Sequence, residues 1–216
     1  MLAYLLWHGP QDGVERETYE RAAEHFHRSL AHAPPAGFRG SALYRVAELP
    51  WLAGGGYEDW YFVDDFTALG VLNAAAVAHG HRGAHDEVAR RYGAAAGGLY
   101  GLLEGCASGG RGRLTARSSG AADLATAAAA SSGGADLAIW ISRPSGAPRR
   151  ELGELLGDGM DPACSSLWRR ALVLGPAPEY CLLAPEAPAG VAPARLPQGW
   201  HAQSVARATV WRGGGV

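Results

Sequence analysis

Lysine is absent from this sequence of 216 residues, so all 19 basic side chains are arginine. A chain without lysine cannot form an imine between a lysine amine and a carbonyl substrate, which excludes Schiff-base catalysis of that kind. The absence of lysine, together with the excess of Ala and Gly, indicates the codon usage of a GC-rich bacterial genome.

Cysteines and long apolar runs are also scarce. Cys106, Cys164 and Cys181 are odd in number and lack CxxC spacing, which argues against a disulfide framework or a cysteine-rich zinc site. No stretch approaches the roughly 20 apolar residues that cross a bilayer, and Met1–His8 lacks a basic region and a cleavage site. We therefore expect no membrane partner, no signal peptide and a cytoplasmic protein with reduced thiols.

The formal net charge is only −2, so no basic field attracts nucleic acid. The P-loop, GxGxxG and GxSxG motifs are all missing, which argues against NTPases, Rossmann dehydrogenases and serine hydrolases. With 48% hydrophobic residues the chain can bury a sizeable core. The expected partner is a small-molecule ligand, and a homo-oligomer stays an open alternative.

The hydrophobic periodicity of the first 105 residues predicts the element order β-α-β-β-α-β. The expected strands and helices are strand 2–8, helix 14–33, strand 38–49, strand 57–63, helix 66–78, a short helical stretch 86–92 and strand 98–104. A break is expected at His79–Gly83. Asp12 and either Asp64 or Asp65 are expected to cap the two long helices, and His25, His27 and His32 to face solvent.

The rest of the chain is predicted to repeat this order in a degenerate form. Residues 106–134 are rich in Gly, Ser and Ala, as in a linker, and Leu167–Arg169 match Leu43–Arg45. Four prolines within 185–197 exclude the second helix of the repeat. The predicted fold class is α+β, with two ferredoxin-like units in tandem (1–105 and 135–216) whose sheets are antiparallel. One α+β domain with a β-rich tail is the alternative.

Two ferredoxin-like units in tandem resemble the α+β barrel superfamily, usually called dimeric α/β barrels. The strand that ends at His8, followed by a helix with Phe26 and His27, is loosely similar to the opening of EthD-like and antibiotic-monooxygenase-like proteins. The resemblance implies a cofactor-free oxygenase, isomerase or lyase, or a haem protein such as a chlorite dismutase. It assigns no catalytic residue, because a shared fold does not fix function.

Acid–base candidates lie in and beside the predicted strands. The catalytic candidates are His8, Glu58, Asp59, Asp64 and His201. The first and third strands are central in a ferredoxin-like sheet, so His8 is expected close to Asp59 or Tyr61. An imidazole beside a carboxylate is suited to general base catalysis near neutral pH. A strand-end histidine bonded to backbone is the plainer alternative.

Aromatic and arginine side chains predict a site for a flat ligand or an anion. The substrate-binding candidates are Tyr44, Arg45, Trp60, Tyr61, Trp168 and Arg169. His79, His81 and His85 are weak metal-ligand candidates, because HGHRGAHD lacks the HExxH arrangement and is also typical of a solvated loop.

The leading functional hypothesis is an enzyme of small-molecule metabolism. It would bind an organic, aromatic-containing substrate in a cavity between sheet faces and use general acid–base residues without a nucleotide cofactor. A haem- or metal-binding protein of the same fold is one alternative, and a non-catalytic ligand-binding or oligomeric structural protein is another. The sequence names no cofactor.

Overall fold

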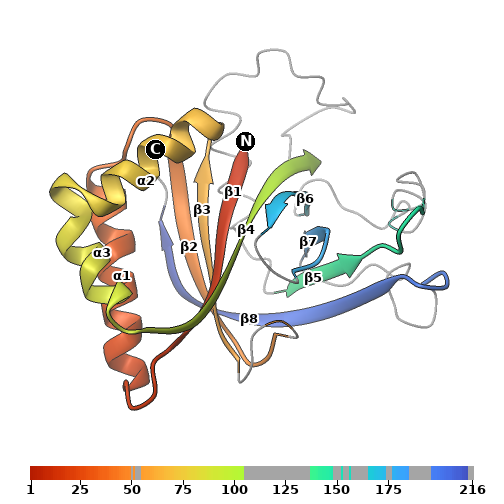
Figure 1. The fold of residues 1–216 in the computed structure, drawn as a ribbon, viewed down its shortest axis with the longest axis horizontal. Helices are drawn as coiled ribbons and strands as arrows, with labels where there is room; N and C mark the ends of the chain where they lie inside the picture. Colours follow the sequence, from red (N-terminus) through yellow and green to blue (C-terminus); the bar gives the residue numbers. More distant parts are fainter. Residues whose placement is uncertain are drawn as a thin grey trace. The chain divides into compact units, whose positions relative to one another are not determined.

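The computed structural model describes residues 1–49, 51, 55–104, 137–147, 152, 156, 165–173, 177–184 and 196–213. Their elements are, in chain order (Figure 1), β1 (Leu2–Pro10), α1 (Arg16–His32), β2 (Phe38–Val46), β3 (Gly56–Val63), α2 (Phe66–Val77), the 3-10 helix η1 (His79–His81), α3 (Arg82–Ala89), β4 (Tyr92–Glu104), β5 (Leu137–Ser142), β6 (Ser166–Val173), β7 (Tyr180–Ala184) and β8 (His201–Gly213). The sequence also predicts a short helix over 148–156. Most of that helix lies outside the described residues, as do the predicted linker 106–134 and nearly all of segment 185–197. The domain boundaries predicted from the sequence stay predictions.

Hydrogen bonds join the eight strands in the order β1-β3-β2-β8-β5-β7-β6-β4, which closes into a barrel. The pairings between described strands are antiparallel. The chain consists of two compact units, the first with residues 1–101, 171–176 and 207–216 and the second with residues 102–170 and 177–206.

The predicted fold class is wrong. The strands form one closed antiparallel β-barrel, and the elements that the structure describes include three α-helices, whereas two tandem ferredoxin-like units of an α-β barrel were expected. The reason is β8, which pairs with β2 through residues 207–213 and with β5 through residues 201–206. One sheet therefore continues through a strand that was expected to complete a second unit. The predicted tandem repeat is wrong as well, because the described strands of both parts of the chain belong to one closed barrel.

The first unit places α1 against one face of the sheet formed by β1, β2 and β3. Tyr19, Ala22, Ala23, Phe26 and Leu30 form the buried stripe of α1, because residues three and four apart share one face of a helix. The stripe packs with strand residues such as Leu43 in one apolar core. Burial of a side chain such as Leu30, which is fully enclosed, stabilises the fold by about 1.5–3 kcal/mol.

The first turn of α2 is capped by an aspartate side chain, and it packs closely against the segment before β2. The Asp65 carboxylate accepts a hydrogen bond from the Ala68 N–H at 2.9 Å, which confirms Asp65 as a helix cap. Gly37 has φ +77°, and a Cβ at this position would lie 2.5 Å from the Cβ of Ala68. Only glycine lets the segment before β2 pass this close to α2. At α1 the capping position is Glu15, without a side-chain bond, so the expected Asp12 cap is wrong.

The His- and Gly-rich segment after α2 is helical. The expected break at His79–Gly83 is wrong, because η1 covers His79–His81 and α3 follows directly from Arg82. The stretch expected to be helical up to Tyr92 ends at Ala89, and Tyr92 opens β4. As a result Tyr92 lies on a strand beside β1, where it pairs with Pro10. No described helix is long and apolar enough to span a membrane.

The second unit is built on strands β5 and β7, with most of β6 and the first part of β8. β7 pairs with β5 on one side and with β6 on the other, and β5 also pairs with β8. Its own apolar core contains Ile139, Ile141, Leu167 and Leu182. The Arg143 guanidinium forms an ion pair with Glu179 at 3.1 Å.

Candidate functional site

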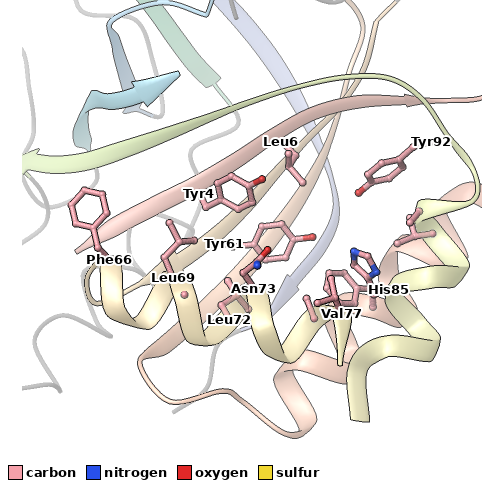
Figure 2. Close-up of a pocket in the computed structure, with 15 residues that line it drawn as sticks. Tyr4, Leu6, Tyr61, Phe66, Leu69, Leu72, Asn73, Val77, His85 and Tyr92 are labelled. Carbon is pink, nitrogen blue, oxygen red and sulfur yellow. The ribbon is translucent and has the colours of Figure 1, made fainter. Parts of the chain in front are cut away.

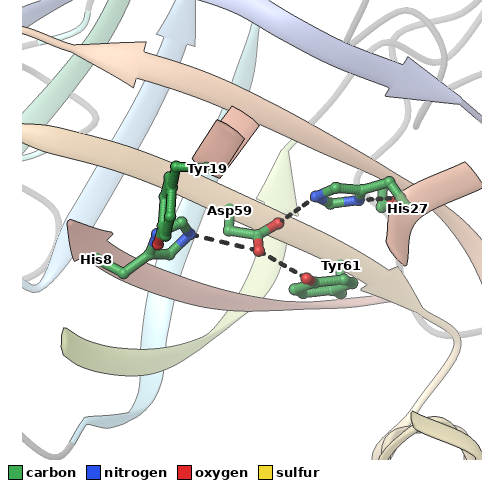
Figure 3. Close-up of polar contacts among 6 residues, drawn as sticks. His8, Tyr19, His27, Asp59 and Tyr61 are labelled. Atoms are coloured by element: carbon green, nitrogen blue, oxygen red, sulfur yellow. Dashed lines mark hydrogen bonds and ion pairs between the residues drawn. The ribbon is translucent and has the colours of Figure 1, made fainter. Parts of the chain in front are cut away.

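A cluster of polar side chains surrounds Asp59 inside the first unit (Figure 3). Asp59 is 2% exposed. Its Oδ1 lies 2.9 Å from His27 Nε2, and its Oδ2 lies 3.5 Å from His8 Nε2. The Tyr61 hydroxyl donates a hydrogen bond of 2.6 Å to the same Oδ2. The carboxylate therefore contacts two imidazoles and one phenol in the interior.

Strand geometry explains why these groups meet. Successive side chains of a strand point to opposite faces, so Asp59 and Tyr61 share the face of β3 that α1 covers. The register pairs His8 of β1 with Tyr57 of β3, and directly opposed residues point the same way. His8 is thus a diagonal neighbour of Asp59, while His27 reaches it from α1.

Each imidazole has a further hydroxyl partner. The Tyr19 hydroxyl lies 2.6 Å from His8 Nδ1, and the Ser41 hydroxyl lies 2.7 Å from His27 Nδ1. Each imidazole also stacks on a phenol ring. The ring centroids of His8 and Tyr92 lie 4.6 Å apart with 18° between the ring planes, and those of His27 and Tyr61 lie 5.3 Å apart with 10° between the planes. A chain of polar contacts thus runs from Ser41 through the two imidazoles and Asp59 to Tyr19.

The charges of this cluster follow from its burial. Burial by itself raises the pKa of Asp59, but the charge and hydrogen bond of His27, followed by those of His8, outweigh it and hold that pKa below its ordinary value. Burial, followed by the charge of Asp59, raises the pKa of Tyr61 well above its usual range. Asp59 is therefore a carboxylate and Tyr61 a neutral phenol that donates its hydrogen to it.

A cavity of about 470 Å³ lies in the first unit, between the strands and helices α2 and α3 (Figure 2). It is lined by Tyr4, Leu6, Phe26, Tyr61, Phe66, Leu69, Gly70, Leu72, Asn73, Ala76, Val77, His85, Val88, Ala89 and Tyr92. Most of this lining is apolar, and its polar groups are three phenols, one amide and one imidazole. Tyr61 belongs both to this wall and to the buried cluster, so it connects the cavity with Asp59.

The three phenols of the cavity influence one another. Tyr4 and Tyr61 lie 6.4 Å apart between ring centroids. Burial, followed by the charge of Asp59, raises the pKa of Tyr4 and also that of Tyr92. All three rings are therefore neutral near neutral pH. Because Tyr61 directs its hydrogen to Asp59, its oxygen offers lone pairs to the cavity.

The structure brings together some of the catalytic candidates. His8 and Asp59 meet inside the first unit, whereas Glu58 faces the opposite side of β3, where Arg207 Nη1 lies 3.9 Å from its Oε2. Asp64 accepts two hydrogen bonds from the guanidinium of Arg39. His201 is exposed on β8, in the second unit. A catalytic role for any of these residues stays a prediction.

The substrate-binding candidates are spread over both units. Tyr61 lines the cavity. Tyr44 and Trp60 share the face of Glu58, since Tyr44 pairs with Glu58 and Trp60 with Ala42. Arg45 forms an ion pair with Glu20 at 3.1 Å. Trp168, whose ring N–H donates to Ser166 at 2.9 Å, and Arg169 lie on β6 in the second unit.

Several residues of the site were missed in the sequence. His27 was expected to face solvent, and this is wrong, because its side chain is fully buried. Its spacing of eight residues from Tyr19 and four from Ala23 places it on the buried stripe, so the helical period held a signal. The helical period indicates that Tyr19 is buried but not that its hydroxyl meets His8, and nothing in the sequence singles out Ser41 or Tyr92.

The metal-ligand candidates have other partners where their side chains are described. His81 Nδ1 lies 2.6 Å from the Ser29 hydroxyl, and His85 Nδ1 lies 3.2 Å from Asp86 Oδ1. The side chain of His79 lies outside what the structure describes. Among the described side chains, no three or more of His, Cys, Asp and Glu are placed to hold a metal ion.

Comparison with known proteins gives a likeness of fold. No protein-family model and no curated protein matches the sequence. An anthrone oxidase-like protein of known structure has 10% identity and a TM-score of 0.54, over 99% of this chain and 92% of its own. A chlorite dismutase-like protein has 9% identity and a TM-score of 0.50, over 97% and 95%. A dimeric protein of ferredoxin-like fold and unknown function from Bacteroides fragilis has 12% identity and a TM-score of 0.34, over 45% and 92%.

Proposed function

We propose that the first unit is a small-molecule enzyme module that binds a flat, largely apolar organic compound with a hydroxyl or carbonyl oxygen. The Tyr61–Asp59–His8 chain would exchange a proton with that oxygen. One observation carries the proposal: Tyr61 lines the cavity, and its hydroxyl donates a hydrogen bond of 2.6 Å to the buried, ionised carboxylate of Asp59. The cavity thus lies between the sheet and helices, in place of the expected position between sheet faces.

The chemistry begins with a ligand hydroxyl that donates to the oxygen of Tyr61. As the ligand proton moves to the oxygen of Tyr61, the hydrogen of Tyr61 moves to Asp59 Oδ2 and from there to His8, whose Nε2 lies 3.5 Å from that oxygen. The ligand is left as an anion, and the cluster has gained one proton. The neutral hydroxyls of Tyr4 and Tyr92 can donate to the new anion. Because its pKa is raised, Tyr61 passes the proton on and does not rest as a phenolate.

The size and lining of the cavity define the ligand class. A volume of about 470 Å³ falls in the range of pockets that enclose a small organic molecule, roughly 300–1,000 Å³. Apolar walls from α2 and α3 with phenols on one side suit fused aromatic rings that carry one oxygen. The name of the anthrone oxidase-like neighbour refers to a fused-ring aromatic ketone.

Haem, the alternative cofactor, does not fit this cavity. Haem carries two carboxylates, and buried carboxylates need cationic partners. The lining residues that the structure describes include one imidazole, His85, and no arginine. No step of the proposed chemistry is therefore assigned to haem.

Binding of 2-naphthol, a flat fluorescent phenol, tests the proposal. We expect the protein to bind it, and Ala76→Phe to abolish binding because the new ring fills the cavity that Ala76 lines. Tyr61→Phe removes one hydrogen bond and should weaken binding by about two- to tenfold. The measurement is a fluorescence titration that follows the emission of 2-naphthol.

Tyr57→Phe is the matched control for this experiment. Tyr57 lies on the same face of the same strand, but its hydroxyl donates to Glu20 at 3.0 Å. We expect its removal to leave the affinity for 2-naphthol unchanged. Equal affinities for the wild type, Ala76→Phe and Tyr61→Phe would reject the cavity as the binding site.

A further inference from the structure

We infer that His85 is a second proton-transfer group of this cavity and that the substrate is an enolisable aromatic ketone, from whose carbon His85 removes a proton. The inference rests on the proposed function and adds to it a reacting carbon and a reaction class. It depends on the position of His85 on the helix wall, across the cavity from the phenols of the strands.

The position of His85 is defined by its neighbours. Figure 2 shows its imidazole, from α3, turned toward the space between Tyr61 and Tyr92. Phe26 of α1 contacts the imidazole in an edge-on arrangement, with centroids 5.5 Å apart and 73° between the planes. The His85 side chain is 31% exposed. It is thus part of the cavity wall and still open to solvent, unlike the enclosed His8 and His27.

The contact with Asp86 orients the imidazole. Asp86 Oδ1 lies 3.2 Å from His85 Nδ1, and Asp86 Oδ2 lies 3.5 Å from the Arg82 guanidinium. The hydrogen bond from His85, ahead of the effect of Arg82, lowers the pKa of Asp86. An ionised carboxylate at Nδ1 favours the tautomer with its hydrogen there, which leaves the lone pair on Nε2. That nitrogen is the base we assign.

The reaction needs residues from both the helix wall and the strand wall of the cavity. His85 Nε2 takes a proton from the carbon next to the carbonyl, the C–H electron pair forms a carbon–carbon double bond, and the carbonyl oxygen becomes an enolate. Tyr4 and Tyr92 donate hydrogen bonds to this oxygen, and the proton stays on His85 Nε2 until it exchanges with solvent or returns to the carbon. The ketone becomes an enolate with no change in oxidation state. No oxidant or further reactant is required.

A pair of the same kind outside the cavity provides the control. His25 of α1 places its Nδ1 3.0 Å from Glu87 Oε2, and both side chains are exposed. His25 does not line the cavity. His25→Gln therefore removes an imidazole paired with a carboxylate without touching the proposed site.

Exchange of carbon-bound hydrogen in 2-tetralone tests the inference. This bicyclic ketone exchanges the protons beside its carbonyl in D₂O, and the loss of their NMR signal gives the rate. The wild type and His25→Gln should accelerate exchange equally, and His85→Gln should slow the protein-dependent rate by about a hundredfold. His85→Ala should lose the same activity and regain part of it with free imidazole, which a purely structural role would not produce.

Two results would overturn the inference. One is no acceleration by the wild type, and the other is equal rates for the wild type and His85→Gln. Binding of 2-naphthol, measured on the same samples, separates these from failure of the proposed function. If 2-naphthol binds while exchange is independent of His85, the cavity remains a binding site and His85 is not its base.

Discussion

Replacing Asp59 with alanine should lower the free energy of unfolding by about 3–5 kcal/mol, because it removes the carboxylate that three buried polar side chains contact. The partners are His8, His27 and the Tyr61 hydroxyl, all of which contact the carboxylate in the interior. The measurement is urea unfolding of the purified variant. A loss this large is expected only where a buried charge network is broken.

Asp64→Ala is the matched control for Asp59→Ala. Asp64 also forms a short ion pair, with Arg39 at 2.6 Å, but both side chains are partly exposed. Water screens such a pair, so its loss should change stability by only about 0–1 kcal/mol. Similar losses in the two variants would contradict the role given to the buried cluster.

The free energy of unfolding at acid pH should also depend on Asp59. The pKa of Asp59 is lowered in the folded protein, so at low pH the unfolded chain binds a proton that the folded chain does not. The ordinary pKa of an aspartate side chain is 3.8. The contribution of Asp59 to stability is therefore complete at pH values well above 3.8 and is lost as the pH falls through 3.8 and below it. Asp59→Ala should lack this part of the acid dependence when unfolding free energies are measured against pH.

Replacing Arg207 with methionine should lower the free energy of unfolding by about 3–5 kcal/mol, because it breaks a buried ion pair by removing one partner. Both side chains are fully buried, with Arg207 Nη1 3.9 Å from Glu58 Oε2. The guanidinium of Arg207 also lies 4.0 Å from the ring centroid of Tyr44. The double variant Glu58→Gln with Arg207→Met should recover most of the loss, since neither buried charge remains.

Arg212→Met distinguishes the buried pair from the contact with Tyr44. Arg212 also lies over the ring of Tyr44, at 5.8 Å, and donates to its hydroxyl at 3.3 Å, but it is only partly buried. Its replacement should reduce stability by about 0–1 kcal/mol. If thermal unfolding gave equal losses for the two arginines, or no recovery in the double variant, the buried ion pair would not be the cause.

Glu58 and Asp59 show how far a strand can be interpreted from sequence. Alternation along the strand predicts that these neighbouring acidic residues face opposite sides of the sheet. The partners were not predictable, because Arg207 comes from β8 and His27 from α1. Pairing between distant segments depends on the tertiary fold, which the local pattern does not contain.

In helix α1 the sequence predicts the range of the helix, but the burial of one of its polar residues was missed. The expected range 14–33 agrees closely with Arg16–His32, and the helical period places the apolar residues of the stripe on the buried face. His27 was placed in solvent because it is polar, although its helical position is on the stripe. Residue type was given more weight than position, and a buried polar group is acceptable wherever it has partners.

The prediction of the fold class failed at the step from the order of the strands in the sequence to their pairing in the sheet. The alternating residues over 200–211 predict a last strand whose range is close to the observed His201–Gly213. Nothing in its pattern shows that one half pairs with β2 and the other half with β5. The matching residues Leu43–Arg45 and Leu167–Arg169 do lie on strands, but a shared strand pattern is too general to establish a repeat.

The buried tyrosines give this protein a built-in optical reporter. Burial comes first among the causes that raise the pKa of Tyr19, Tyr57, Tyr61 and Tyr92 above the ordinary 10.0. Their raised values stabilise the fold below that pH, and the contribution is lost as alkali rises beyond it. A phenolate absorbs ultraviolet light at longer wavelengths than a phenol. Late, cooperative growth of that band in alkali would therefore record the opening of the core, with no dye or label attached.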